Sequence, residues 1–234
     1  MLKRVAVGVG KALRDTGQAI ERMGCRAQDN FIFNEPYCRH RAVMNLYDQR
    51  PRVAQGAFIA PNAAVIGNVD IEPRTSIWYG AVIRGDQSNI FIGGESSIGD
   101  RSVVQSSTVN PTGFSARTCI GDWVKIGQGC VLRACTIEDY CQIGDGCIVQ
   151  EGALIENGAM LEPGSVVPQG ARVPAGEVYA GNPATFVRKL SKEEIEEFGE
   201  YAEEVCDLAA KHLDEFLDYP TTYQLREQMA KETK

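Results

Sequence analysis

Aliphatic residues return at every sixth position between Val53 and Val178, often followed by Gly and then by Asp or Asn. A period of six matches neither the 3.6 residues per turn of an α-helix nor the 2.0 of a flat strand. It is typical of a hexad-repeat parallel β-helix, in which each hexad forms one short side of a triangular coil. The aliphatic positions are Val53, Ile59, Val65, Ile71, Ile77, Ile83, Ile92, Ile98, Val104, Ile120, Ile126, Leu132, Ile137, Ile143, Val149, Ile155, Leu161, Val167 and Val173.

The expected coil has a simple physical basis. One aliphatic side chain per side points into a narrow prism, and stacking successive coils makes this core continuous. Gly, Asn and Asp after the aliphatic residue suit the corners, which need φ > 0 or local side-chain turns. Three hexads complete one coil of about 18 residues, so the region 53–184 is predicted to be an all-β domain of about seven coils.

Breaks in the hexad register indicate where function lies, because insertions at the corners of a β-helix become loops on one face. A slip of three residues follows Arg84-Gly85-Asp86, and the register shifts again by four residues before Ile120. The second slip contains the segment 110–116, which we expect to protrude. In a trimer of such prisms, loops and corners that face a neighbour would form the clefts between subunits.

The segment 1–26 is predicted to be an amphipathic helix with six basic and two acidic residues. This composition is typical of a mitochondrial targeting segment, and also of a helix that lies on an anionic membrane surface. We expect the helix to pack on a partner or a lipid surface, the alternative being a helix folded back on its own subunit. Its apolar side contains Val5, Val9, Leu13, Ala19, Ile20 and Met23.

The other flanking segments have simpler patterns. Residues 27–52 are expected to be irregular, and 185–220 are expected to contain a C-terminal helix followed by a polar tail, 221–234. Ser191 has the chemistry of an N-cap, with Glu194 completing a capping box. Residues Ile195, Phe198, Ala202, Val205, Ala209, His212 or Leu213, and Phe216 recur at a spacing of 3–4 and predict one apolar stripe.

Composition excludes several classes of function. A formal charge of −7 argues against nucleic acid as a partner. No run of eighteen apolar residues predicts a membrane span, and no apolar h-region predicts a secretory signal. Cys130 and Cys147 fall one coil apart on the same side, where buried thiols are favoured over a disulfide. Neither histidine suggests a ligand: His40 lies outside the repeats between two arginines, and His212 is expected to be packed or at the rim of the helix.

Several motifs together resemble the γ-class carbonic anhydrases, and most closely the γ-carbonic-anhydrase-like subunits attached to mitochondrial complex I. The resemblance covers most of the chain and implies a left-handed coil. Hexad repeats alone would be unspecific, because many acyltransferases share them. The motifs are Gly17-Gln18-Ala19, Arg39-His40-Arg41, Met44-Asn45, Ser76-Ile77-Trp78-Tyr79-Gly80, Arg84-Gly85-Asp86, Gly176-Glu177-Val178, Gly181-Asn182-Pro183-Ala184 and Arg188-Lys189-Leu190.

The resemblance also implies where a zinc site would lie. Enzymes of this family bind zinc through three histidines from two neighbouring subunits of a trimer, and the matching positions here are Gln105, Gln128 and Arg133. An amide oxygen is a weak zinc ligand, and a guanidinium places a fixed positive charge where a dication would sit. Gly99 stands where the family often has Gln. The family residues retained at the subunit seam are Arg84, Asp86, Asp100 and Asn182.

The sequence therefore predicts a catalytically inactive structural subunit without cofactor. The resemblance implies a homo- or heterotrimer attached to the matrix side of the membrane arm of complex I at the mitochondrial inner membrane, with residues 1–26 in contact with lipid or the arm. Three alternatives stay open: a pseudo-enzyme that binds an anion through Arg133 or a lipid head group, a zinc enzyme with rearranged ligands, and a hexad-repeat acyltransferase. Acyl transfer in such folds usually needs a histidine base, which no repeat contains.

Overall fold

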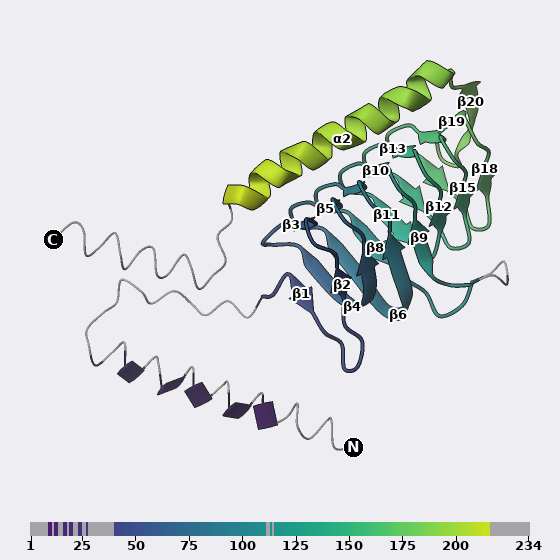
Figure 1. The fold of residues 1–234 in the computed structure, drawn as a ribbon. Helices are drawn as coiled ribbons and strands as arrows, with labels where there is room; N and C mark the ends of the chain where they lie inside the picture. Colours follow the sequence, from purple (N-terminus) through teal and green to yellow (C-terminus); the bar gives the residue numbers. More distant parts are fainter. Residues whose placement is uncertain are drawn as a thin grey trace. The chain divides into compact units, whose positions relative to one another are not determined.

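The computed structural model describes residues 40–110, 113 and 115–215, together with 9–10, 12–13, 16–17, 19–20, 23–24 and 27. The chain divides into two units, Met1–His40 and Arg41–Lys234. The second unit is the predicted parallel β-helix, with one long helix beside it (Figure 1).

The strands of the coil stack on three sides of a triangular prism. Side one consists of β3 (Phe58–Ile59), β5 (Ser76–Ile77), β7 (Ser97–Ile98), β10 (Lys125–Ile126), β13 (Gln142–Ile143), β16 (Met160–Leu161) and β19 (Glu177–Ala180). Side two consists of the first halves of β4 (Ala64–Ile71) and β6 (Val82–Ile92), with β8 (Val103–Gln105), β11 (Val131–Arg133), β14 (Ile148–Val149) and β17 (Val166–Val167). Side three consists of the second halves of β4 and β6, with β9 (Thr118–Ile120), β12 (Thr136–Ile137), β15 (Leu154–Ile155) and β18 (Arg172–Val173).

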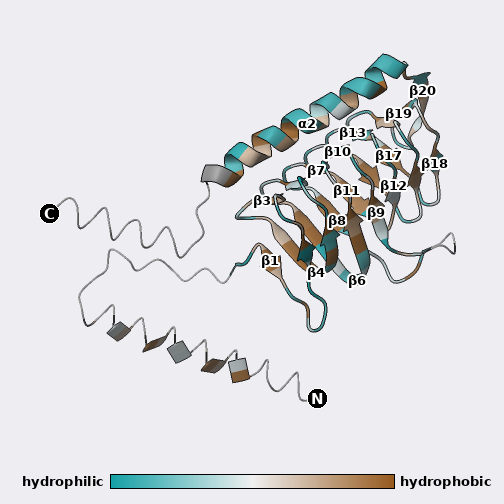
Figure 2. Cartoon of the chain, in the orientation of Figure 1, coloured by the Kyte–Doolittle hydropathy of each residue, from teal (hydrophilic) through white to brown (hydrophobic). Residues whose placement is uncertain are grey.

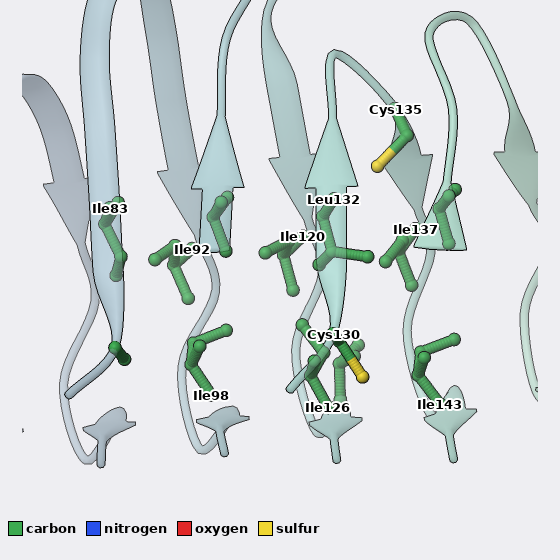
Figure 3. Close-up of a cluster of buried hydrophobic side chains, with 14 of the residues drawn as sticks. Ile83, Ile92, Ile98, Ile120, Ile126, Cys130, Leu132, Cys135, Ile137 and Ile143 are labelled. Atoms are coloured by element: carbon green, nitrogen blue, oxygen red, sulfur yellow. The ribbon is translucent and has the colours of Figure 1, made fainter. Parts of the chain in front are cut away.

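The hexad aliphatics form the core because the parallel register stacks them coil upon coil. Ile126 pairs with Ile143, and Leu132 pairs with Val149. All four are almost completely buried, and the labelled side chains of Ile126, Leu132 and Ile143 point into the prism (Figure 3). Hydropathy colouring shows the same concentration of apolar residues on the strands (Figure 2). The predicted fold class is confirmed, while the handedness of the coil stays a prediction.

A second buried position lies two residues before most of the aliphatic residues, and on most coils a small side chain occupies it. Cys130 and Cys147 hold this position on adjacent coils as free thiols, which confirms their predicted role as small core residues. Their sulfurs donate to the carbonyl oxygens of Gly144 at 3.1 Å and Glu162 at 3.2 Å. The equivalent thiol of Cys141 is buried, and this burial raises its pKa to about 12, so it remains protonated.

The coil starts earlier than the hexad pattern indicates. Strands β1 (Val43–Met44) and β2 (Arg52–Val53) both pair in parallel with β4. The segment 27–52, expected to be irregular, therefore contributes to the first coil. The hexad pattern misses this start because a short antiparallel bridge between Leu46 and Gln49 interrupts the repeat.

The second register slip is also longer than the sequence suggests. In this coil, β8 is the strand on side two, and the next strand along the chain is β9 on side three. No strand forms among the described residues between Gln105 and Thr118, so these residues belong to a loop at this corner. Both slips, after Arg84 and after Gln105, fall at the same corner of adjacent coils.

The coil ends in an antiparallel strand rather than directly in a helix. Strand β20 (Thr185–Lys189) turns back along β19, so the predicted helical segment 185–220 begins with a strand. Helix α2 (Lys192–Glu215) follows. Ser191 Oγ accepts from the Glu194 N–H at 3.2 Å, and the Glu194 carboxylate accepts from the Ser191 N–H at 2.8 Å, which confirms the capping box. The Arg188 guanidinium beside it lowers the pKa of Glu194 to about 2.

Helix α2 packs along side one of the prism (Figure 1). Its buried stripe contains Ala202, Cys206 and Ala209, while the acidic face is exposed. His212 Nδ1 lies 2.9 Å from the Tyr79 hydroxyl, among the rings of Phe58, Trp78 and Tyr79. His212 is therefore a packed residue, as predicted. Phe216, Pro220 and the tail 221–234 lie outside the described residues.

The described residues between Val9 and Ala27 are all helical. Val9, Leu13, Ile20 and Met23 on the predicted apolar side each expose more than half of their surface. None of the helices in the described part of the chain has the length and hydropathy that crossing a bilayer requires.

The stacked core predicts a large cost for opening a cavity in a central coil. Leu132→Ala should lower the free energy of unfolding by about 3 kcal/mol, because the side chain is fully buried and its packed neighbours cannot move to fill the cavity. Chemical denaturation followed by circular dichroism measures this loss. Leu208→Ala, at an exposed position of α2, is the control and should change stability by less than about 0.5 kcal/mol. Equal losses in both variants would contradict a continuous core.

Candidate functional site

Gln105 and Arg133 lie on adjacent coils at the second corner, which we define as the turn between sides two and three. The strand register pairs Arg84 with Gln105 and Gln105 with Arg133. Adjacent strands of a sheet lie about 4.8 Å apart. The three side chains therefore form a ladder in which Gln105 lies between two guanidinium-bearing residues.

Both arginines of this ladder have an acidic partner in the same chain. Arg84 Nε lies 3.1 Å from Asp86 Oδ2, and Arg133 Nε lies 2.9 Å from Glu151 Oε1. The Glu151 side chain is only 16% exposed, whereas the Arg133 side chain is 53% exposed. Arg133 is therefore anchored by a largely buried carboxylate, while about half of its own side chain stays exposed.

Gln128 lies at the first corner, which we define as the turn between sides one and two. It borders an open pocket of about 560 Å³. The Gly129 N–H donates to the Asp100 carbonyl at 2.8 Å, and the Gln128 N–H donates to Asp145 Oδ1 at 2.8 Å. Gln128 thus lies in register between Asp100 on the preceding coil and Asp145 on the following one, and the Asp145 carboxylate contacts its backbone. The pocket is lined by Asn62, Tyr79, Gly80, Asp100, Arg101, Gln128, Gly129 and Asp145.

The acidic residues of these turns tie one coil to the next. Asp100 accepts from the Tyr79 N–H at 2.9 Å, as Asp145 does from Gln128. At the turn between sides three and one, Asp139 accepts from the Asp122 N–H at 2.9 Å. Asp100, predicted as a retained residue of the subunit seam, therefore already has a structural role within one chain.

Glycine is required at corners where the backbones of adjacent coils approach closely. A Cβ on Gly99 would lie 2.5 Å from the carbonyl oxygen of Gly127 on the next coil, far inside normal contact. Enzymes of the family that the sequence resembles often have Gln at this position. In this chain, the close stacking of the coils accounts for Gly99.

One chain does not bring the three family positions together. Gln105 and Arg133 lie at the far end of side two, whereas Gln128 precedes β11 at its near end. Each chain therefore presents two separate half-sites on two corners. Asn182 lies elsewhere, in the turn between β19 and β20 on the last coil, and its peptide bond to Pro183 is cis.

The residues at these positions do not fit zinc. They offer two amides and a guanidinium that is already paired with Glu151. Among the described residues, no group of three or more His, Cys, Asp or Glu side chains is arranged to hold a metal ion. Of the two histidines, His212 is packed among aromatic rings, and His40 is exposed outside the coil.

The outer surface of side two is a continuous apolar strip that sequence reasoning missed. One outward aliphatic follows another on every coil, in direct register. Val131 is 40% exposed and Ile148 is 39% exposed. The signal was available in the residue before each inward aliphatic. An uncovered strip of this kind is typical of a protein–protein interface. It consists of Ala64, Val82, Val103, Val131, Ile148 and Val166.

Comparison with known proteins gives two kinds of match. A family model described as dynactin subunit 5 matches residues 49–215, which is the coil together with α2. Among solved structures, a hexapeptide transferase family protein from Anaplasma phagocytophilum is 39% identical, with a TM-score of 0.67, over 72% of this chain and 96% of that one.

Curated relatives extend the likeness to nearly the full length. Mitochondrial gamma carbonic anhydrase 3 of Arabidopsis thaliana is 51% identical over 207 residues, covering 88% of this chain and 80% of that protein. Mitochondrial gamma carbonic anhydrase-like 2 of the same plant is 50% identical over 187 residues, covering 80% of this chain and 73% of that protein.

The carboxylate tie predicts different outcomes for two substitutions of Asp100. Asp100→Ala should lower the free energy of unfolding by about 1–2 kcal/mol, because the Tyr79 N–H loses a charged acceptor. Asp100→Asn should cost less, since its amide oxygen still accepts this hydrogen bond. Chemical denaturation compares the two variants. An unchanged stability in Asp100→Ala would contradict the structural role.

Proposed function

Because this chain belongs to the γ-carbonic anhydrase family, we propose that it is a zinc-free structural subunit of a trimer of such proteins. The observation that carries the proposal is Arg133, at a zinc-ligand position of the family, held by an ion pair with Glu151. The proposed role is to assemble and to bind neighbouring proteins, without hydrating carbon dioxide.

The chemistry of the replaced positions argues against hydration. A zinc enzyme needs ligands that leave one open position for a water whose pKa falls to about 7. A guanidinium is always charged and has no lone pair to give to a metal. Gln105 and Gln128 contribute at most weak amide oxygens. Binding a dication here would also require separating Arg133 from Glu151.

A trimer is supported by the two half-sites and by the apolar strip between them. The half-sites lie at the two ends of side two, and the strip covers the surface that joins them. Packing three prisms through this side buries the strip and brings the first corner of one subunit to the second corner of the next. The replaced positions of this chain then border two seams. In a heterotrimer, at most one seam, between two partners that keep their histidines, could hold zinc.

The names of the relatives support a mitochondrial location. We place the trimer on the matrix side of the inner membrane, peripherally attached to the membrane arm of respiratory complex I. The exposed apolar residues of the N-terminal helix, such as Leu13 and Ile20, would contact that arm or lipid head groups. A structural role also agrees with the family model whose description is a subunit of a larger assembly.

A second candidate function is a pseudo-enzyme that binds an anion. Its support is the half-exposed Arg133 side chain at the same corner as the guanidinium of Arg84, with Gln105 between the two. The ion pairs with Glu151 and Asp86 oppose it, because the two charges are already compensated. An acyltransferase lacks support, since neither histidine of the chain lies in the coil.

Metal content tests the zinc-free role. The purified full-length chain, incubated with zinc and then dialysed, should retain far less than one zinc per subunit, and its hydration rate in stopped-flow assays should equal the buffer background. Zinc at one ion per seam, together with hydration that Arg133→Ala abolishes, would contradict the proposal.

A triple substitution tests whether the three positions meet at the seam. Gln105→His, Gln128→His and Arg133→His together restore three imidazole ligands, so this variant should bind zinc at one ion per seam if the subunits trimerise as proposed. Mass spectrometry of the native assembly measures the gain. The matched control replaces only Gln105 and Gln128, leaves Arg133 in place, and should bind much less. If the triple variant gained no zinc, the three positions would not meet at a seam, and the proposed packing would be contradicted.

The N-terminal helix predicts the attachment to complex I. Deleting residues 1–26, or the pair Leu13→Glu and Ile20→Glu, should release the trimer from complex I, because both remove the exposed apolar side. Co-purification measures the release. Val109→Glu with Leu208→Glu adds the same charge at exposed apolar positions of the second unit and should leave attachment intact. Unchanged co-purification of the deletion variant would contradict this role.

A further inference from the structure

The two corners of side two carry complementary chemistry. At the first corner, Asp100 and Asp145 line the pocket on either side of Gln128. At the second corner, the half-exposed Arg133 side chain is paired with Glu151, and no other acidic partner of its guanidinium is found within the described ranges. The first corner thus offers two carboxylates, together with Arg101, at a pocket, and the second corner offers an exposed cation.

These groups also match in height along the coil axis. Gln128 and Arg133 flank the same side-two strand, β11, and so belong to the same coil. Asp100 lies on the coil before it, and Asp145 and Glu151 lie on the coil after it. Prisms packed with parallel axes therefore bring Arg133 of one to the level of Gln128 of the next, between the two carboxylates.

We infer that a second copy of this chain fills the pocket, with Arg133 of one copy lying between Asp100 and Asp145 of the next. The inference rests on the proposed trimer and names the partner at its seam. A guanidinium thereby takes the position of the family's metal and holds two subunits together by ion pairing instead of coordination.

The carboxylates retain the acceptors that this contact needs. Asp100 and Asp145 each use Oδ1 to accept a backbone N–H of their own chain. The other oxygen of each aspartate can accept a charge-assisted hydrogen bond from a terminal nitrogen of a guanidinium.

Glu151 gives a further reason for a cation at this place. It lies on the same coil as Asp145, so it would approach Asp145 of the neighbouring copy across the seam. Two facing carboxylates repel each other unless a cation lies between them. Arg133, already bonded to Glu151, supplies that cation and links three acidic side chains from two copies.

The contact joins unlike corners, so it can repeat around a closed ring. An interface of this head-to-tail type closes when its rotation returns to the starting subunit. Three copies related by a threefold axis satisfy this condition. The strip from Val82 to Val166 then faces the equivalent strips of the other two copies. A second copy satisfies both the charges and the apolar surface of side two.

A charge exchange tests the inference on the full-length chain, with sedimentation velocity as the measurement. The wild type should be a trimer at micromolar concentration. Arg133→Glu and Asp145→Arg alone should each weaken the trimer by roughly a hundredfold, because each leaves like charges facing across the seam. The double variant restores opposite charges in every seam and should recover the trimer. Asp145→Asn keeps its backbone acceptor and should weaken the trimer by a smaller factor.

The matched control is Arg172→Glu, since Arg172 also binds a carboxylate, Glu156, through its Nε but lies on side three. It should leave the trimer intact. A trimer insensitive to Arg133→Glu, or one that the double variant fails to restore while both proteins remain folded, would overturn the inference and leave the zinc-free trimer standing. A monomeric wild type would also overturn it. Stoichiometric zinc in a trimeric wild type would instead overturn the proposed function.

Discussion

The close stacking of parallel coils is the constraint on which the rest of this structure depends. Each coil repeats its inward aliphatic over that of the coil below, as Leu132 does over Val104. Where the backbones meet at the corners, a Cβ on Gly99 or Gly127 would collide with the next coil. Aspartates such as Asp145 then connect adjacent coils through backbone N–H groups. The inward aliphatic residues, the corner glycines and the aspartate hydrogen bonds thus all depend on the same stacking of coils.

This stacking assigns the stability of the fold and the chemistry of its corners to different residues. Gln105, Gln128 and Arg133 project from corners, and the prism is filled by the neighbouring aliphatic and small side chains. Histidines at these positions can therefore be replaced without opening a cavity in the core. The chain can keep the shape and assembly surfaces of a γ-carbonic anhydrase while its proposed seam uses a guanidinium and carboxylates.

The hexad pattern predicted the coil because its inward positions obey a strict steric rule. Ser191 and Glu194 predicted the start of α2, since a capping box depends on neighbours in sequence. The beginning of the coil at Val43 and the strand β20 were missed, because both depend on pairing with strands already formed. The apolar strip of side two escaped attention because its residues, such as Val131, alternate with stronger inward signals.

Part of the candidate site could be derived from sequence in the same way. The family resemblance identified Gln105, Gln128 and Arg133, but it did not show that Arg133 pairs with Glu151, which follows 18 residues later on the next coil. That contact appears only when the coil brings the two residues together. The pocket around Gln128 likewise needs five successive turns of the first corner, from Asn62 to Asp145, to form.

In the proposed assembly a guanidinium, and not a metal, occupies the family's zinc position. The most direct measurement is a crystal structure of the native assembly with anomalous data collected on both sides of the zinc absorption edge. We expect continuous density for Arg133 at each seam to which this chain contributes that residue, and no anomalous peak there. A zinc peak within bonding distance of Gln105 or Gln128, with Arg133 displaced from Glu151, would contradict it.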